Sequence, residues 1–510
     1  MRWRRYVGTL IGLLAAAVAI GVGELVAAFV RPEASPIIVV GNRIITLTPE
    51  PVKRTAIDNF GTNDKTALLF TIYVLLAAFG AFVGSLAQRR LAYGLLGVAA
   101  FGAFGCYCAL TAGAARTTDV LPTLAGTAAA ATVMIVLAES AARRRPAHAR
   151  GTDRTDRRRF LQGSVATAGL AAIGGFGGRA VQHSRFDVAA ARQQVALPKP
   201  VTPAPVAVRR SDFGKSSYPW ATANDAFYRI DTALSVPQIN PKQWSLRIHG
   251  MLDREITLSY DQLRQRPLIE RWITLCCVSN EVGGNLVGNA RWLGARLADL
   301  LREAGVHADA DQLVLSSADG MTIGAPTKAV LDGRDALIAI GMNGDPLPVE
   351  HGFPARIVVP GLYGYVSACK WVVDIEATTF AQRKAYWVQG GWAQQTDIKL
   401  ESRIDTPQSG GTVQAGKPVA IAGVAWDQHV GVSKVEVQVD NDAWLPARLS
   451  SVPSTDTWRQ WVVAWTPPKP GSYTVRVRAT DDHGTAQTDK EQPVFPSGAT
   501  GLHKITVRAK

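Results

Sequence analysis

Cysteine is scarce in this sequence, and histidine is missing from its apolar segments. The 510 residues contain five cysteines, and none belongs to a Cys-x-x-Cys-His motif or to a set spaced for an iron–sulfur cluster. All eight histidines lie outside the four long apolar stretches, at 148, 183, 249, 307, 351, 429, 483 and 503. This pattern excludes a bis-histidine haem within those stretches. We therefore expect neither haem nor an iron–sulfur cluster to be encoded.

Acidic residues are few in the N-terminal third, so that region is strongly basic. Residues 1–159 hold 19 Lys and Arg against 9 Asp and Glu, a net charge of +10 out of +14 for the whole chain. The excess accompanies the apolar runs, which is typical of membrane topology and not of a phosphate-binding surface. Nucleic acid is therefore not expected as a partner, whereas a lipid bilayer is.

Four apolar stretches are long enough to cross a bilayer, at about Tyr6–Val30, 66–87, 91–113 and 120–141. Buried helices of a soluble protein are the alternative, but the Gly and Ala content and the scarcity of charge favour a membrane bundle. Clusters of basic residues mark the cytoplasmic ends of membrane helices. In this sequence the clusters are Arg2, Arg4 and Arg5; Arg89 and Arg90; and Arg143, Arg144 and Arg145. Residues 31–65 then form an outside loop, whose apolar run 37–40 lies at the interface.

Glu24 is an acidic residue in the outer part of the first apolar stretch, and it needs an explanation. An intramembrane acid is a functional candidate by default. Its place near the end of the first stretch makes interfacial snorkelling an equal alternative.

A basic motif precedes a fifth, weaker apolar run. Asp156-Arg157-Arg158-Arg159-Phe160-Leu161 is followed by the Gly/Ala-rich residues 163–178. The motif is either the cytoplasmic anchor of a fifth helix or an internal twin-arginine export signal. In both cases the segment runs from inside to outside, so we expect everything after about Arg179 to be extracytoplasmic.

The chain is organised around residues 272–301. A β-prone run carries two adjacent cysteines, Cys276 and Cys277, into a Gly/Asn-rich loop, and a short helical pattern with Leu at 293, 297, 300 and 301 follows. Buried core thiols are one reading, because free cysteine often acts as a small hydrophobe. The other is a single thiolate at a non-zinc metal site, since no second Cys or His pair follows at zinc-finger spacing. Strand alternation places only one of the two thiols in the pocket.

Two blocks of sequence resemble the sulfite oxidase family of molybdopterin enzymes. The first is Thr274-Leu275-x-Cys277-x-x-Asn280 with Ala290-Arg291-Trp292-x-Gly294. The second runs from Met342-Asn343-Gly344 through His351-Gly352-Phe353-Pro354-x-Arg356 and Val358-Val359-Pro360-Gly361 to Lys370-Trp371. The resemblance covers roughly residues 210 to 510.

The resemblance implies a molybdenum–molybdopterin cofactor with Cys277 as the metal ligand, and Cys276 as a neighbour at a variable position. An anionic group clamped by His351, Arg356 and Lys370 is identified as the pterin phosphate, although a buried structural histidine is the simpler reading of His351. Arg229 falls where the family has an arginine facing the metal pocket, so we expect a catalytic role for Cys277 and Arg229. The full expected set of cofactor-binding residues is Cys277, Asn280, Asp319, His351, Arg356, Ala368, Cys369 and Lys370.

The C-terminal composition differs from the rest. Short alternating strands at 419–424, 435–439, 461–465 and 473–479 are separated by Pro, Gly, Asn and Asp clusters, which predicts a β-sandwich. Its tryptophans at 426, 444, 458, 461 and 465 are expected in the core. The matching family domain is Ig-like and often dimerises, so a homodimer through a structurally passive domain is the expectation.

The expected fold class is therefore an N-terminal α-helical membrane bundle, an α+β sulfite-oxidase-type molybdopterin domain, and an all-β Ig-like sandwich. The expected boundaries are 1–142 for four transmembrane helices, 143–180 for the basic segment and fifth membrane segment, 181–210 for a linker, 211–395 for the catalytic domain and 396–510 for the sandwich.

By this resemblance, the protein is a membrane-anchored oxidoreductase that transfers an oxygen atom to or from a small oxo-substrate in a two-electron reaction. The family's substrate-binding arginine and pocket tyrosine are replaced by Val282 and Ile340. Sulfite would lose charge-assisted hydrogen bonds of roughly 1.5–3 kcal/mol each. A sulfoxide or N-oxide is comparably suited.

Electrons must reach a separate membrane or soluble partner. The alternatives are a cofactor-free membrane-anchored binding protein and a transporter with a sensor domain.

Overall fold

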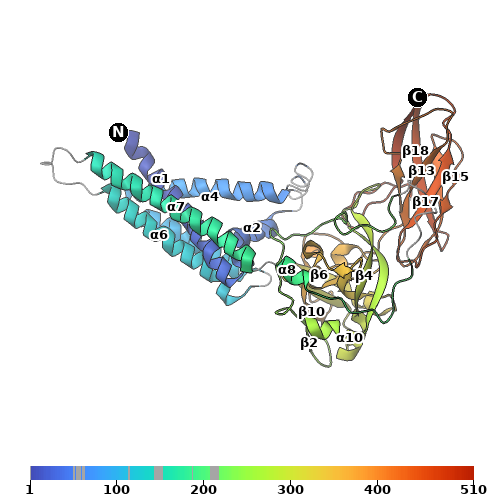
Figure 1. Cartoon of the computed structure of the whole chain (residues 1–510), viewed down its shortest axis with the longest axis horizontal. Helices are drawn as coiled ribbons and strands as arrows, with labels where there is room; N and C mark the ends of the chain where they lie inside the picture. Colours follow the sequence, from blue (N-terminus) through green and yellow to red (C-terminus); the bar gives the residue numbers. More distant parts are fainter. Residues whose placement is uncertain are drawn as a thin grey trace. The chain divides into compact units, whose positions relative to one another are not determined.

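The computed structural model describes residues 2–510 except 50–51, 53–54, 56–58, 60–63, 113–114, 143–152, 186–187 and 207–217. The chain forms two compact units (Figure 1). The helical unit comprises Met1–Val188 with Thr232–Gln238, and the second unit comprises Ala189–Asp231 with Ile239–Lys510. The basic run at 143–145 and the expected start of the globular domain at Ser211 lie outside the described residues.

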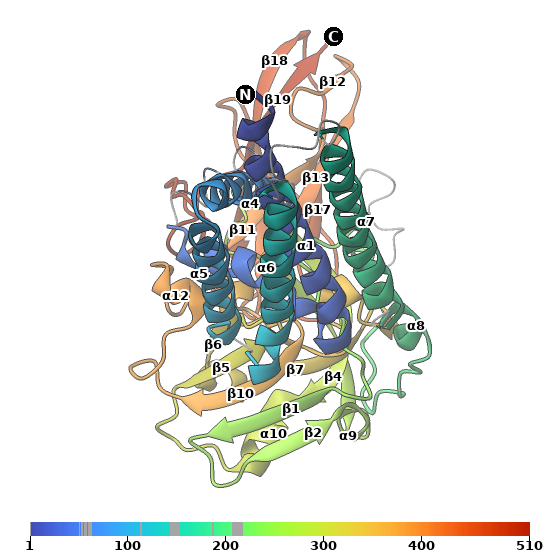
Figure 2. The ribbon, with the colours of Figure 1, turned by 90° about the vertical axis from the view of Figure 1, so that its left-hand side faces the viewer.

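The helical unit is built from long helices that lie side by side (Figure 2). They are α1 (Arg2–Val30), α4 (Asp64–Arg89), α5 (Leu91–Leu110), α6 (Leu121–Ala142) and α7 (Asp153–Arg185). In the described part of the chain, four segments are long and apolar enough to cross a membrane, and they lie at Tyr6–Val30, Lys65–Arg89, Leu91–Leu110 and Thr117–Ala141. The four predicted helices are thus confirmed, and they fit a membrane anchor. Helix α7 forms over the expected fifth segment but does not belong to this apolar set.

Small residues let α1 pack closely against its neighbours. A Cβ on Gly12 would lie 1.8 Å from the carbonyl oxygen of Gly80 in α4, and one on Gly21 would lie 2.5 Å from that of Ala171 in α7. A Cβ on Gly126 in α6 would lie 2.4 Å from the carbonyl oxygen of Ala19. Contacts of backbone against backbone are how helices associate where lipid leaves little hydrophobic driving force between them.

The segment expected to be an outside loop contains a helix, α2 (Pro36–Leu47). Proline stands at its first position, where the missing amide hydrogen costs no intrahelical bond. Ser35, just before α2, donates a 2.5 Å hydrogen bond from its hydroxyl to the Glu24 carboxylate, and Gln182 Nε2 donates to the Glu24 carbonyl oxygen at 3.0 Å. Glu24 is buried and partnered inside the protein. The snorkelling alternative is therefore wrong.

The N-terminal part of the second unit is an α+β domain with two sheets. One has the order β2-β1-β10-β5-β6, with β1 (Ser245–Gly250), β2 (Ile256–Ser259), β5 (Gln312–Ser317), β6 (Thr322–Pro326) and β10 (Val372–Thr378). The other has the order β3-β4-β7-β8, with β9 on β7; its strands are β3 (Leu268–Cys276), β4 (Val287–Arg296), β7 (Leu337–Met342), β8 (Asp345–Pro346) and β9 (Arg356–Val358). Short helices accompany the sheets, at α9 (Tyr260–Arg264), α10 (Leu297–Ala304), α11 (Thr327–Leu331) and α12 (Tyr386–Gln389). The two sheets share one large apolar core.

The helical pattern predicted from Leu293 begins too early. Leu293 lies in β4, where it pairs with Glu270 of β3 and Gly341 of β7. Helix α10 begins only at Leu297. Leu293 and Leu297 stand four residues apart, which imitates a helical repeat, but the sheet pairing on both sides of β4 decides the conformation.

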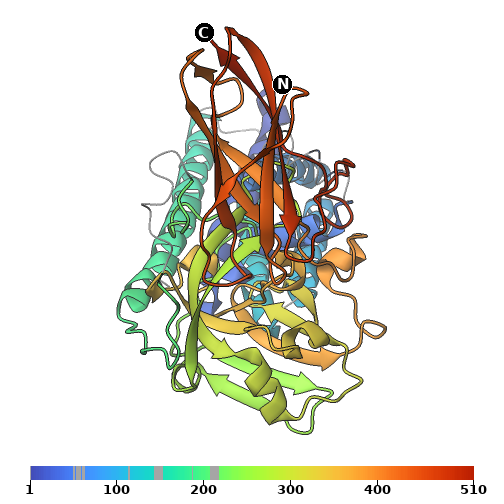
Figure 3. The same ribbon diagram turned by 90° about the vertical axis from the view of Figure 1, so that its right-hand side faces the viewer.

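The C-terminal part of the second unit is a two-sheet sandwich (Figure 3). One sheet has the order β11-β13-β17-β16, with strands β11 (Glu401–Thr406), β13 (Val419–Trp426), β16 (Arg448–Leu449) and β17 (Arg459–Trp465). The other has the order β12-β19-β18-β14-β15, with strands β12 (Thr412–Val413), β14 (Val432–Val439), β15 (Leu445–Pro446), β18 (Gly471–Asp481) and β19 (Lys504–Ala509). The predicted sandwich is confirmed. Trp426, Trp458, Trp461 and Trp465 are buried as expected, whereas Trp444 is half-buried and stacks on the Arg478 guanidinium at 4.1 Å.

Buried hydrogen bonds join the two parts of this unit near the end of β3. Thr274 in β3 donates its backbone amide to the Asp456 carbonyl at 2.9 Å and receives the Trp458 backbone amide on its hydroxyl at 2.8 Å. Gln428 Nε2 donates to the Thr274 carbonyl at 3.2 Å. The sandwich therefore fixes the strand that carries the two adjacent cysteines.

Candidate functional site

The two thiols mark the end of β3 and the start of a loop that folds back on itself. The backbone amide of Cys277 donates to the Leu286 carbonyl at 2.9 Å, and the amide of Asn280 donates to the Cys277 carbonyl at 2.9 Å. At the tip, Gly283 has a φ of +77°, and a Cβ there would lie 2.2 Å from the His503 ring. Only glycine fits both the left-handed backbone and this close approach.

Cys276 and Cys277 have different surroundings. Cys276 is fully buried in the large core, where its thiol donates to the Cys277 carbonyl at 3.5 Å. Cys277 is 9% exposed and interacts electrostatically with Lys370. Burial raises the pKa of the Cys277 thiol, while the backbone amide and hydroxyl of Ser279 and the charge of Lys370 oppose that rise. Cys277 is thus the thiol with polar groups ready to stabilise a thiolate.

Three residues from the second sequence block lie close to one another, and the charge of one of them, Lys370, acts on Cys277. They are His351, at the end of the short 3₁₀ turn η6 (Val349–His351), Arg356 in β9, and Lys370 just before β10. Burial lowers the pKa of Arg356 to about 10, and burial lowers the pKa of Lys370 to about 8, with the neighbouring positive charge of Arg356 acting in the same direction. The pKa of His351 falls to about 4 through burial first, then through the charges of Arg356 and Lys370. His351 therefore adds no charge to the cluster at neutral pH.

The backbone is shaped to bring these residues together. Gly352 has a φ of +110°, and a Cβ on it would lie 3.0 Å from the Arg356 Cβ and 3.2 Å from the Lys370 Cα. Trp371 has a φ of +51°, a conformation of order 1–3 kcal/mol above the usual regions for a non-glycine residue. Its indole donates to the Val349 carbonyl at 2.8 Å, which holds Lys370 beside η6.

The Arg356 side chain has an unused donor. Its two terminal nitrogens donate to the His351 carbonyl at 3.2 Å and the Ala368 carbonyl at 3.5 Å, and its guanidinium lies 5.0 Å from the centre of the Trp292 ring. Its buried Nε has no hydrogen-bond partner among the described residues. A buried, charged nitrogen without an acceptor costs free energy, so this site fits an anionic group such as the phosphate of a pterin cofactor.

Lys370 and Arg229 share one carboxylate. Lys370 Nζ donates to Asp231 Oδ2 at 2.8 Å and to the Glu350 carbonyl at 3.1 Å, and Arg229 Nε donates to the same Asp231 oxygen at 2.9 Å. The Arg229 side chain is 43% exposed, whereas that of Asp231 is 3% exposed. Arg229 also contributes to the lowered pKa of both Lys370 and His351, so it lies at the outer edge of this cationic cluster.

The remaining expected residues have more local roles in the structure. Both polar atoms of the Asn280 amide have protein partners: Oδ1 accepts from the Leu286 amide at 2.9 Å, and Nδ2 donates to Glu401 Oε2 at 3.2 Å. Asp319 accepts from the Met321 amide at 3.1 Å, and burial raises its pKa. Ala368 supplies the carbonyl that faces Arg356, and Cys369 is buried with a raised pKa.

Sequence reasoning missed residues that the fold brings to the cysteines. Burial, followed by the two cysteines, raises the pKa of Tyr228 well above its usual value, so this buried phenol is close enough to interact electrostatically with both thiols. From the sandwich, the Arg403 guanidinium donates to the Gly284 carbonyl at 2.8 Å. Burial raises the pKa of Glu401 to about 8 against the opposing Asn280 hydrogen bond. Tyr228 adjoins Arg229 in the sequence, but nothing in the local pattern of Glu401 or Arg403 indicated a role.

The geometry agrees with comparisons to known proteins. A family model described as "Oxidoreductase molybdopterin binding domain" matches residues 233–387, and one described as "Bacterial Ig domain" matches residues 401–477. The uncharacterized oxidoreductase YuiH of Bacillus subtilis is 32% identical over 155 residues, which are 30% of this chain and 75% of YuiH. Mitochondrial sulfite oxidase of Mus musculus is 30% identical over 326 residues. The chain belongs to the sulfite oxidase family of molybdopterin-binding oxidoreductases.

The match to this family is partial in length. The aligned region is 54% of this chain and spans 59% of the mouse sulfite oxidase. Among solved structures, the sulfane dehydrogenase SoxCD of Paracoccus pantotrophus superposes with a TM-score of 0.50 at 21% identity, covering 57% of this chain and 84% of the SoxCD chain. That likeness supports the sulfite-oxidase-type fold, and the family match supports a molybdenum cofactor.

Proposed function

We propose that this protein is a membrane-anchored molybdenum oxidoreductase that transfers an oxygen atom to or from a small oxo-substrate in a two-electron reaction. The observation that carries the proposal is the pairing of Cys277 with a cationic cluster that contains an unpartnered, buried Arg356 Nε. An unsatisfied buried polar group costs about 1–3 kcal/mol, and an anionic ligand that accepts from Arg356 Nε would remove this cost.

Each residue of the site then has a defined task. Cys277 would provide the thiolate that holds molybdenum, with the Ser279 amide and hydroxyl stabilising its negative charge. Arg356 and Lys370 would hold the pterin phosphate, and Asp231 orients Lys370. Asn280, Asp319, Ala368 and Cys369 would line the same cofactor site. When bound, the molybdenum–pterin group supplies the two-electron oxygen-transfer chemistry.

The substrate is proposed to be a weakly charged oxo-compound, such as a sulfoxide or an N-oxide. Val282 lies on the loop from Cys277 to Leu286, called the cofactor loop below, and is half-buried; Ile340 in β7 is fully buried. Neither of these positions therefore offers a charge or a hydroxyl group. Arg229 remains as an exposed cation, already partly neutralised by Asp231. One guanidinium suits a polarised S=O or N–O bond better than a dianion such as sulfite.

The same proposal places the protein in the cell membrane. The four apolar helices would cross the bilayer, and the catalytic and sandwich domains would lie on the extracytoplasmic side. Export through the twin-arginine-like motif at 156–161, dimerisation through the sandwich and an electron partner on a separate carrier are parts of this proposal.

Substrate class can be tested on the purified full-length protein with artificial electron carriers. We expect reduced viologen to drive reduction of dimethyl sulfoxide or trimethylamine N-oxide, and sulfite oxidation with ferricyanide to be slower. Faster sulfite oxidation would overturn the substrate class. A molybdenum-loaded protein inactive with all three compounds would overturn oxygen-atom transfer.

A further inference from the structure

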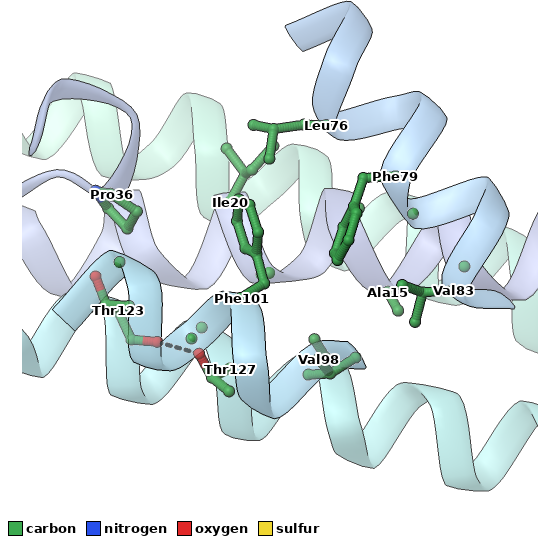
Figure 4. A pocket seen from close by; sticks show the side chains of 18 of the residues that line it. Ala15, Ile20, Pro36, Leu76, Phe79, Val83, Val98, Phe101, Thr123 and Thr127 are labelled. Carbon is green, nitrogen blue, oxygen red and sulfur yellow. Dashed lines mark hydrogen bonds between the residues drawn. The ribbon is translucent and has the colours of Figure 1, made fainter. Parts of the chain in front are cut away.

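The helical unit contains a partly open apolar cavity that the proposed reaction does not use (Figure 4). The space in it that water-sized molecules can occupy is about 100 Å³, between α1, α2, α4, α5 and α6. Every side chain that lines it is apolar except those of Thr123 and Thr127. Its walls include the rings of Phe79 and Phe101, whose centres lie 5.2 Å apart at an angle of 34°. The wall of the cavity is thus almost entirely hydrocarbon and includes two aromatic rings.

The two threonine hydroxyls on the wall differ in their partners. Thr127 Oγ1 donates to the Thr123 carbonyl at 2.7 Å, the usual use of a threonine inside an apolar helix. Thr123 is 6% exposed, and its Oγ1 has no hydrogen-bond partner among the described residues. A buried hydroxyl without a partner in an otherwise apolar cavity indicates a ligand that brings a hydrogen-bond acceptor.

Thr123 lies at one end of the cavity wall, beside Pro36 of α2 in the same lining. A Cβ on Gly23 would lie 2.6 Å from Pro36 Cγ and 3.4 Å from the Pro122 carbonyl oxygen, so α1, α2 and the start of α6 meet here. The Thr123 hydroxyl is the unsatisfied polar group of an otherwise apolar wall. The matching ligand is therefore an amphiphile, with a polar head near Thr123 and a hydrocarbon tail among the apolar helices.

We propose that this cavity binds the head and first tail carbons of an isoprenoid quinone from the membrane. A quinone carbonyl would accept the Thr123 hydrogen bond, and its flat ring would pack against Phe79 and Phe101. A phospholipid acyl chain would fill the space but leave the Thr123 hydroxyl unsatisfied.

The redox balance also fits a quinone, and this part of the inference rests on the proposed function. Oxidising a substrate with an oxygen atom from water releases two electrons and two protons. Conversion of one quinone to one quinol consumes the same two electrons and two protons. In the reductive direction, one quinol supplies them and one water is released.

The test is photolabelling of the full-length protein in phosphatidylglycerol–phosphatidylethanolamine vesicles with an azido analogue of decylubiquinone. We expect label on peptides of α5 and α6, and unlabelled decylubiquinone should remove it. Thr123→Val should raise about tenfold the decylubiquinone concentration that displaces half of the label, because one hydrogen bond is lost. Thr127→Val is the matched control and should change it less than twofold, because the Thr127 hydroxyl is already satisfied.

A second pair of variants tests the space itself. Val98→Phe, at a half-buried position on the cavity wall, should abolish specific labelling, whereas Ala99→Phe, on the exposed neighbouring position, should not. The quinone site would be overturned if added phospholipid displaced the label as well as decylubiquinone does. It would also be overturned if labelling were unchanged in Thr123→Val and Val98→Phe.

The labelling does not depend on molybdenum. Failure of the quinone site and failure of the proposed function can therefore be distinguished. Labelling measures the first, and viologen-linked activity in the same preparations measures the second. That activity should be unchanged in all four variants.

Discussion

Asn280 Nδ2 on the cofactor loop lies 3.2 Å from Glu401 Oε2 in the first strand of the Ig-like sandwich. Together with the 2.8 Å bond from Arg403 to the Gly284 carbonyl, this contact ties both halves of the loop to the sandwich. The loop between β3 and β4 has no regular structure to fix it. The sandwich, expected to be passive, therefore supports the loop that starts at Cys277.

Glu401→Gln should change how stability depends on pH. Burial raises the pKa of Glu401 to about 8 in the folded protein, from an ordinary value of 4.5. A carboxyl group whose pKa is raised in the folded state makes its full contribution to the free energy of unfolding below about pH 4.5. This contribution is lost as the pH rises through about 8. The glutamine mimics the protonated acid, so the variant should match the wild type at pH 5 and melt about 2–4 °C higher at pH 9 for each ~1 kcal/mol recovered. Thermal unfolding at both pH values measures this.

The control for that variant is Glu255→Gln, which changes an exposed carboxylate paired with Arg247. It should show no gain at pH 9. A Glu401→Gln protein that melts below the wild type at pH 9 would contradict the account.

Arg356→Gln should weaken retention of the cofactor. The variant removes the charged, unpartnered Nε, and a charge-assisted hydrogen bond contributes about 1.5–3 kcal/mol. We expect roughly 10- to 150-fold faster loss of pterin on dilution, followed by pterin fluorescence. Arg247→Gln, at an exposed ion pair, is the matched control and should lose pterin at the wild-type rate.

Lys370 should make anion binding depend on pH. Burial lowers the pKa of Lys370 to about 8, so its ammonium is charged at pH 7 and increasingly neutral above 8. Cofactor-free protein should therefore bind inorganic phosphate more weakly at pH 9 than at pH 7, by calorimetry. Lys370→Met should bind weakly at both values. A wild-type affinity that rises with pH would rule out this role.

Arg229→Ala should act on substrate binding more than on turnover. The side chain is 43% exposed, so solvent screens it, and we expect KM to rise about three- to tenfold with a smaller change in kcat. Steady-state kinetics with viologen would measure both constants. Arg254→Ala, at an exposed pair with Glu303, serves as the control. An unchanged KM would remove Arg229 from the substrate site.

Compact motifs made part of the candidate site predictable from the sequence. Cys277, His351, Arg356 and Lys370 stand in two blocks whose residue spacing is specific; the structure clusters the last three, and the charge of Lys370 acts on Cys277. Glu401 and Arg403 were missed because their contacts with the loop span 121 and 119 residues of chain, and no local pattern marks such tertiary contacts.

Local structure was misjudged where two signals conflicted. Leu293 fitted a helical repeat but is held in β4 by strands on both sides. The prolines around 32–51 suggested a loop, yet Pro36 stands at the first position of α2, where proline is compatible with a helix.

The central claim is that Cys277 holds a molybdenum cofactor. The most direct measurement is the molybdenum and pterin content of matured full-length protein, compared with Cys277→Ala and Cys276→Ala. We predict about one molybdenum per chain in the wild type and in Cys276→Ala, and loss of molybdenum in Cys277→Ala. A matured wild type with neither metal nor pterin, or a Cys277→Ala protein that keeps its molybdenum, would contradict the account.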